Sequence, residues 1–148
     1  MRQTDRNWTI SSILLATVGV SLALSGLYFL LLRPPLLPED IRYMGLPEDQ
    51  LAAVRPRLEL WLSQVFRVMG GYVLATGVLT ITLAATAYRA HDRGAYFGAV
   101  AGGAASICLM AVVNFAIDSD FKWALLGMAL LWAFSLAVFW LEESRKPG

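Results

Sequence analysis

Apolar residues in this 148-residue chain gather into four long runs, separated by polar stretches. The runs cover residues 9–32, 68–88, 95–117 and 121–141. A helix rises 1.5 Å per residue, so a run of about 20 apolar residues can cross the hydrocarbon core of a bilayer. The runs are too long and too evenly apolar for barrel strands, and backbone amides in hydrocarbon must bond within the segment. The pattern therefore predicts four transmembrane helices.

We accordingly predict an all-α membrane protein, a four-transmembrane-helix bundle that forms a single domain over residues 1–148. Arg33-Pro34-Pro35 follows the first run, in place of a small-residue cleavage site. We therefore expect this run to be a retained span rather than a signal peptide. An even number of spans places both termini on one side of the membrane. Aromatic residues near the ends of the runs are typical of interfacial belts.

The polar segment 33–64 contains the sequence Leu-Pro-Glu-Asp twice, at 37–40 and at 46–49. Each copy predicts a helix start, because proline suits the first turn and acidic residues there complement the helix dipole. Gly45 is expected to end the first short helix. Beyond Pro56, apolar residues recur every three or four positions, which indicates an amphipathic lead-in to the second span. The pattern leaves open whether this lead-in is continuous with the span, lies among lipid headgroups or caps the bundle.

Composition supports the bilayer as the main partner. Hydrophobic residues make up 57% of the chain and charged residues 16%, and the net charge is +1. This balance gives no basis for nucleic-acid binding. Cys108 is the single cysteine and His91 the single histidine, so we expect neither a disulfide nor a metal site, and no cofactor. His91 is expected to be solvated in a short charged turn.

Basic residues do not decide the orientation. Each side of the predicted membrane carries six: Arg2, Arg6, Arg89, Arg93, Arg145 and Lys146 on the side of the termini, and Arg33, Arg42, Arg55, Arg57, Arg67 and Lys122 on the other. Seven acidic residues lie opposite the termini and four beside them. On this smaller asymmetry we expect both termini to be cytoplasmic, in a bacterial inner (plasma) membrane.

The third run carries a stripe of small residues at four-residue spacing, Gly94, Gly98, Gly102 and Ser106. A stripe of this kind lets another helix approach closely. It is interpreted either as a face for a homo-oligomer or a membrane-protein partner, or as packing within the same chain, and we favour the second. Weaker pairs occur in the first two runs: Gly19 with Ala23 and Gly71 with Ala75.

Charged groups near hydrocarbon are the best candidates for a binding site, because each needs a partner or a path to water. Arg67 precedes Gly70-Gly71-Tyr72, so its guanidinium could bind an anionic headgroup or a carboxylate, with Trp61 nearby on the lead-in. The alternative, which we favour, is an arginine that extends to the membrane surface without a ligand.

A second polar cluster contains Asn114, Asp118, Asp120 and Lys122. If the third helix continued one more turn, Asn114 and Asp118 would share a face and help to line a polar mouth. The alternative assigns Asp118 or Ser119 to helix capping and Lys122 to the membrane surface, and we favour it.

The sequence contains no recognisable catalytic set. Serine and threonine residues within the runs lack a neighbouring base, so we predict that the protein is not an enzyme. No carboxylate lies near the middle of a span, where transporters usually place ionisable groups.

Four short-looped spans, a longer polar segment after the first, and Arg67-Val68-Met69-Gly70-Gly71-Tyr72 at the start of the second resemble DoxX-like small membrane proteins. The resemblance covers the plan of the whole chain and implies a bundle, with no catalytic residue. We predict a non-enzymatic accessory or interaction subunit. The alternative is a protein that binds or transports a lipid, quinone or other amphiphile, and a cavity leading to Arg67 would favour it.

Overall fold

The computed structural model describes residues 8–145 and is helical throughout its ordered elements. Its helices are α1 (Ile10–Leu31), α2 (Pro38–Met44), α3 (Glu48–Leu83), η1 (Ala84–Tyr88), α4 (Arg93–Gly103), η2 (Ala104–Cys108), α5 (Leu109–Ala116) and α6 (Lys122–Ser144). The segments η1 and η2 are single π-helical turns that continue their neighbouring α-helices.

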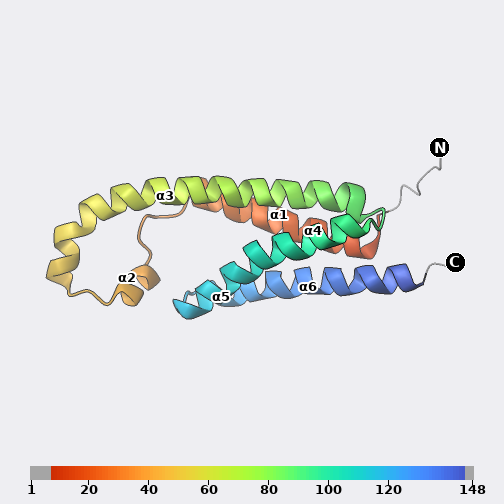
Figure 1. Cartoon of the computed structure of the whole chain (residues 1–148). Helices are drawn as coiled ribbons and strands as arrows, with labels where there is room; N and C mark the ends of the chain where they lie inside the picture. The colour runs from red at the N-terminus through yellow and green to blue at the C-terminus, as the bar shows by residue number, and fades with distance from the viewer. Residues whose placement is uncertain (1–7, 146–148) are drawn as a thin grey trace.

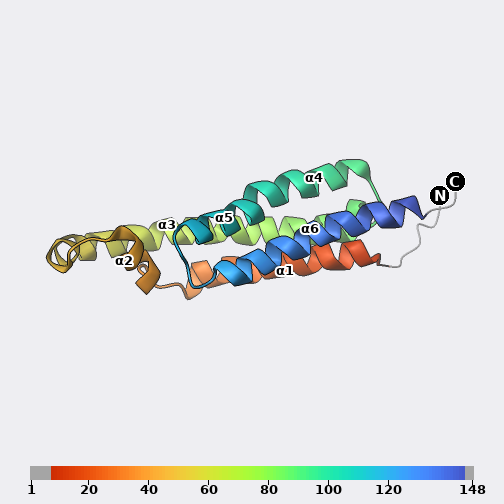
Figure 2. The same ribbon diagram turned by 90° about the horizontal axis from the view of Figure 1, so that it is seen from below.

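Four of the resulting helices are long and apolar enough to cross a membrane: Ile10–Leu31, Glu48–Tyr88, Arg93–Ala116 and Lys122–Ser144. The predicted fold class is thereby confirmed, with a short helix between the first two spans. The start of α1 and the end of α6 lie at the same end of the molecule, together with the turn between η1 and α4 (Figures 1 and 2). This arrangement is the one expected from the predicted even number of crossings.

The second span is much longer than its apolar run, because the amphipathic lead-in is continuous with it. Glu48–Tyr88 is one helix of 41 residues. Pro56 lies inside this helix, and the turns around it bend away from the axis of the rest (Figure 1). A proline within a helix removes one backbone hydrogen bond and favours such a bend.

The two Leu-Pro-Glu-Asp sequences both start helices. Pro38 occupies the first turn of α2, and Gly45 ends that helix with a φ of 60°. Pro47 precedes α3, which begins one residue later at Glu48. The positive φ of Gly45 is a left-handed conformation, which glycine takes without strain. The prediction that Gly45 ends the first short helix is therefore confirmed.

Helices α1 and α3 pack backbone to backbone through glycines. A Cβ added at Gly26 would lie 2.4 Å from the backbone nitrogen of Leu74, and one at Gly77 would lie 2.4 Å from that of Ala23. A Cβ added at Gly70 would lie 2.8 Å from the backbone nitrogen of Leu30 in α1, whereas one at Gly71 would meet nothing within 4 Å. The prediction that Gly71 packs closely is therefore wrong, and its neighbour Gly70 does so instead, because the rotation of the helix decides which glycine meets α1.

The four spans do not form an evenly closed bundle. Helix α1 packs closely against both α3 and α6. Helix α5 packs on α6, whereas α4 makes fewer contacts and divides them between α6 and the end of the second span, at η1 and α3. The shared core lies near the end that holds the termini, where Leu15 and Val18 meet Tyr88 and Phe139. Towards α2, the chain of α4 and α5 diverges from α3 (Figure 1).

Candidate functional site: a cavity between the helices

A cavity of about 790 Å³ occupies the space between the spans on the side of α2. Its size falls in the range of small-molecule binding pockets. All four spans and α2 contribute to its wall, so elements far apart in the sequence form it, and part of it is open to the surroundings. Its apolar wall includes Leu22, Val73, Leu109, Met110, Val113 and Leu125.

Polar groups gather at one end of this cavity, beneath the short helix α2. Of the described residues in its wall, three are charged: Arg33, Glu39 and Asp40. Ser119 and Asn114 lie in the same wall. We call the part formed by these residues the polar end. The cavity therefore combines a larger apolar part with a small charged part. These two parts are complementary to the apolar tail and the polar head of an amphiphile.

Arg33 is held rigidly at the polar end. Its side chain is 7% exposed, and its guanidinium lies 2.9 Å from Oδ2 of Asp40 and 3.6 Å from the centre of the Phe66 ring. A second guanidinium nitrogen donates to the carbonyl oxygen of Pro34 at 2.9 Å. The same Asp40 oxygen accepts the N–H of Leu37 at the start of α2. The pair thus joins the end of α1 to the first turn of α2.

Glu39 is buried beside this pair. It is 4% exposed and lies in the wall of the cavity. Within residues 8–145 its carboxylate has neither a hydrogen bond nor an ion pair. Among the described residues, the one fully enclosed side-chain polar atom without a partner is His91 Nε2, so the Glu39 carboxylate oxygens reach the open space of the cavity. Another molecule can therefore supply the partner that the protein does not.

Aromatic rings line the cavity next to the polar end. Tyr28 lies between Phe29, at 5.7 Å between ring centres, and Phe121, at 6.4 Å. All three belong to the cavity wall. Their faces carry negative electrostatic potential, which attracts cations.

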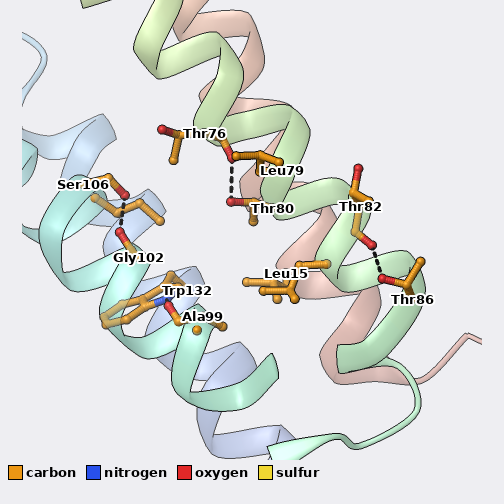
Figure 3. A pocket seen from close by; sticks show the side chains of 14 residues that line it. Leu15, Thr76, Leu79, Thr80, Thr82, Thr86, Ala99, Gly102, Ser106 and Trp132 are labelled. Carbon is orange, nitrogen blue, oxygen red and sulfur yellow. Dashed lines mark hydrogen bonds between the residues drawn. The ribbon is translucent and has the colours of Figure 1, made fainter. Parts of the chain in front are cut away.

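A second, smaller cavity of about 440 Å³, here called the side cavity, opens between α3 and α4. Figure 3 shows threonines of α3 on one wall and Ala99, Gly102 and Ser106 on the other. Thr76 and Ser106 line both cavities, so the two adjoin. The hydroxyl of Ser106 donates to the carbonyl of Gly102 within its own helix. Such bonds satisfy the hydroxyls and leave an apolar surface.

The small-residue stripe forms part of this side cavity rather than a helix contact. A Cβ at Gly98 or Gly102 would meet nothing within 4 Å, and one at Gly94 would meet only Asp92 Oδ1. The favoured interpretation, packing within the chain, is therefore wrong for these positions. Gly103, one residue further on, is the packed glycine, with Trp132 against it. The oligomer face stays a prediction.

The structure does not bring the first group of predicted ligand residues to the cavity. Trp61 and Tyr72 are 62% and 73% exposed, and Arg67 is exposed as well. None of the three lines the large cavity or the side cavity. The exposed position of Arg67 fits the favoured interpretation, an arginine at the surface without a ligand. The less favoured mouth at Arg67 is not formed; α3 presents Phe66 to the cavity, and the arginine in its wall is Arg33.

The second predicted cluster is divided between different surroundings. Only Asn114 lines the cavity, and its amide donates to the carbonyl of Met110. The helix ends at Ala116, and Asp118 has a φ of 52°, so the extra turn expected to align it with Asn114 does not form.

The charged members of this cluster form ion pairs at the surface, one within the cluster and one with Arg42. Lys122 is paired with Asp118, and this hydrogen bond lowers the pKa of the Asp118 carboxyl. Asp120 lies 3.2 Å from Arg42. Ser119 Oγ accepts the N–H of Phe121 before α6. The predicted capping of the fourth helix by Asp118 or Ser119 is not observed, because α6 has Phe121 as its N-cap without a side-chain hydrogen bond. As in the favoured interpretation, these charges need no ligand, since each has an ion-pair partner.

His91 lies at the opposite end of the molecule and is not solvated as expected. Its side chain is 5% exposed, and its ring stacks on Phe139 at 4.8 Å. A φ of 58° in the turn before α4 brings the ring inward. Its Nε2 lies 3.4 Å from Oε2 of Glu142 without the alignment of a hydrogen bond. No group of three potential metal ligands occurs among residues 8–145.

Sequence reasoning missed Arg33, Glu39 and Asp40 as site residues. They were assigned to a connector and to helix starts, which is correct locally for Asp40. The available signal was the spacing: an arginine directly after a span, with two carboxylates in the next helix start, can fold back onto the end of that span.

The geometry defines a small four-span integral membrane protein with a cavity between its helices. No protein-family model, curated protein or solved structure matches the chain. The resemblance to DoxX-like proteins accordingly stays a prediction from the sequence.

Proposed function

We propose that the protein is a non-enzymatic membrane protein that binds an amphiphile in the cavity between its spans. The apolar tail lies against Leu22, Val73 and Met110, and the polar head lies at the polar end beneath α2. The observation that carries the proposal is the cavity itself, which is apolar along its length and charged at one end.

Two features favour this function over the accessory subunit. The helices separate where a passive bundle would be filled, and the charged residues at that point face the interior. The side cavity adds apolar space next to Thr76 and Ser106. An accessory role would depend on the outer surface, where the open face at Gly98 and Gly102 offers a contact for a second membrane protein or copy.

The proposal includes the expected membrane, the orientation and the resemblance to a protein family. It assigns the protein to a bacterial plasma membrane with cytoplasmic termini, which puts the polar end on the opposite face of the membrane. It also retains the likeness to DoxX-like proteins as a likeness of plan.

Native mass spectrometry of gently extracted protein tests the proposal. Val73→Trp fills the cavity, whereas Val68→Trp on the same helix points outward, where Val68 is exposed. Ala105→Trp fills the cavity from η2 and serves as a second variant. We expect a bound amphiphile to be retained by the wild type and by Val68→Trp, and to be lost from both filled variants.

Circular dichroism checks that the two variants with a filled cavity, Val73→Trp and Ala105→Trp, are folded. Retention of the same amphiphile by all four proteins would place it on the outer surface and overturn the proposal. Absence of any bound amphiphile in the wild type, even after incubation with a lipid extract, would also overturn it.

A further inference from the structure

The charges around the cavity do not balance. Arg33 and Asp40 form a pair at 2.9 Å, which leaves Glu39 as the third charged residue of the wall. The described wall therefore carries one uncompensated negative charge at its polar end. In an apolar surrounding such a charge strongly favours a ligand with a positive charge.

Arg33 is not available to bind an anionic head group. Its guanidinium bonds to Asp40 and to the carbonyl of Pro34, and one face lies on the Phe66 ring. These contacts use the arginine to hold α1, α2 and α3 together. The Glu39 side chain has no such role, because its carboxylate forms no hydrogen bond or ion pair with residues 8–145.

The neighbouring rings suit the same kind of ligand. Tyr28, Phe29 and Phe121 line the cavity beside the polar end. Ammonium groups are recognised in proteins by a carboxylate together with aromatic faces, since both lower the energy of the cation out of water.

We propose that the head group is an ammonium, bound by the carboxylate of Glu39 and by the aromatic rings of the same cavity wall. This inference rests on the proposed function and narrows its ligand to cationic amphiphiles. The ammonium could belong to a free alkylamine or to the head group of an aminolipid, and both share this chemistry.

Matched dodecyl probes test the inference on the full-length protein in uncharged polyoxyethylene micelles. Dodecylamine, dodecanol and dodecanoate share a tail and differ in the charge of the head. Titrations followed by native mass spectrometry compare the wild type with Glu39→Gln. Glu48→Gln is the control, since Glu48 is exposed in the first turn of α3 and outside the cavity wall.

We expect dodecylamine to bind the wild type and Glu48→Gln about tenfold more tightly than dodecanol, or better. Glu39→Gln is expected to remove this preference and leave dodecanol binding unchanged. Equally tight binding of the three probes, unaffected by Glu39→Gln but blocked by Val73→Trp, would overturn the ammonium inference and leave the proposed function standing. Preference for dodecanoate would overturn the inference too, and absence of all binding would overturn both.

A further arm separates the two sources of the ammonium. Lysophosphatidylethanolamine carries the same ammonium on a phosphate and a single tail. If the wild type binds this lysolipid and Glu39→Gln does not, the site is assigned to aminolipids. If only dodecylamine binds in a manner that depends on Glu39, the site is assigned to free amines.

Discussion

Ile10 donates its backbone N–H to Oε1 of Glu142 over 2.9 Å, so the last turn of α6 caps the first turn of α1. The N–H of Ser11 donates to the same oxygen at 3.3 Å, and its hydroxyl bonds to the other carboxylate oxygen. The first amides of a helix have no partner within the helix, and a carboxylate there also complements the helix dipole. One side chain thereby joins the first and last spans.

Glu142→Ala is expected to lower the free energy of unfolding by about 1–3 kcal/mol, because it leaves two helix amides and a buried hydroxyl without their acceptor. Glu142→Gln keeps an acceptor in place and is expected to lose less. Thermal unfolding in micelles measures both variants, and hydrogen exchange at Ile10 and Ser11 locates the change. Equal stability of wild type and Glu142→Ala would contradict the assigned role.

The adjacent glycines of α3 are expected to respond oppositely to alanine. Gly70→Ala places a Cβ 2.8 Å from the backbone nitrogen of Leu30, which is expected to cost about 1–3 kcal/mol. Gly71→Ala meets nothing within 4 Å and is expected to be neutral or to stabilise the helix by about 0.5–1 kcal/mol. Reaction of the single Cys108 with a thiol dye during heating reports unfolding. A loss of stability in Gly71→Ala alone would show that the register of α1 against α3 is different.

A second glycine pair tests the packing of α4 on α6. The indole N–H of Trp132 donates to the carbonyl of Ala99 at 3.0 Å, directly against Gly103. Gly103→Ala places a Cβ 2.1 Å from that nitrogen, so the ring must move and the hydrogen bond break. The indole signal of Trp132 in a nuclear magnetic resonance spectrum is expected to shift upfield in Gly103→Ala and to stay in place in Gly102→Ala. An unchanged signal in both would refute this contact.

Arg33 and Arg67, at the two ends of the segment between the first two spans, are expected to contribute differently to stability. Arg33→Ala leaves Asp40 without its cation and removes the contact with Phe66, which is expected to cost about 3 kcal/mol. Arg67→Ala removes an exposed side chain and is expected to change stability by less than about 0.5 kcal/mol. Chemical unfolding of both variants makes the comparison. A larger loss of stability in Arg67→Ala than in Arg33→Ala would contradict these assignments.

The spans could be predicted from the sequence because hydropathy and length are local properties. The apolar runs match the helices at most ends to within three residues, and Gly45 and the two proline-led helix starts follow from local turn chemistry. The long second helix was left open, since an amphipathic lead-in has the same periodicity whether or not it joins the span.

The site could not be predicted in the same way, because it depends on how the helices are rotated. Gly70 and Gly71, or Phe66 and Arg67, are neighbours in sequence, yet one of each pair faces inward and the other faces out. An apolar helix with little amphipathic character gives no signal of that rotation. Glu39 appeared only as a helix-start residue, and its burial follows from α2 folding over the end of the bundle.

Photo-crosslinking measures most directly whether an amphiphile occupies the cavity. Dodecyl probes that carry a diazirine on the chain, one with an amine and one with a hydroxyl head, are bound in micelles, irradiated and mapped by peptide mass spectrometry. The proposed function predicts saturable adducts on the cavity wall, at Leu22, Met110 and Leu125, that excess unlabelled probe removes and Val73→Trp abolishes. Adducts confined to outward residues such as Leu60, Val78 and Leu130, unaffected by competition, would contradict it.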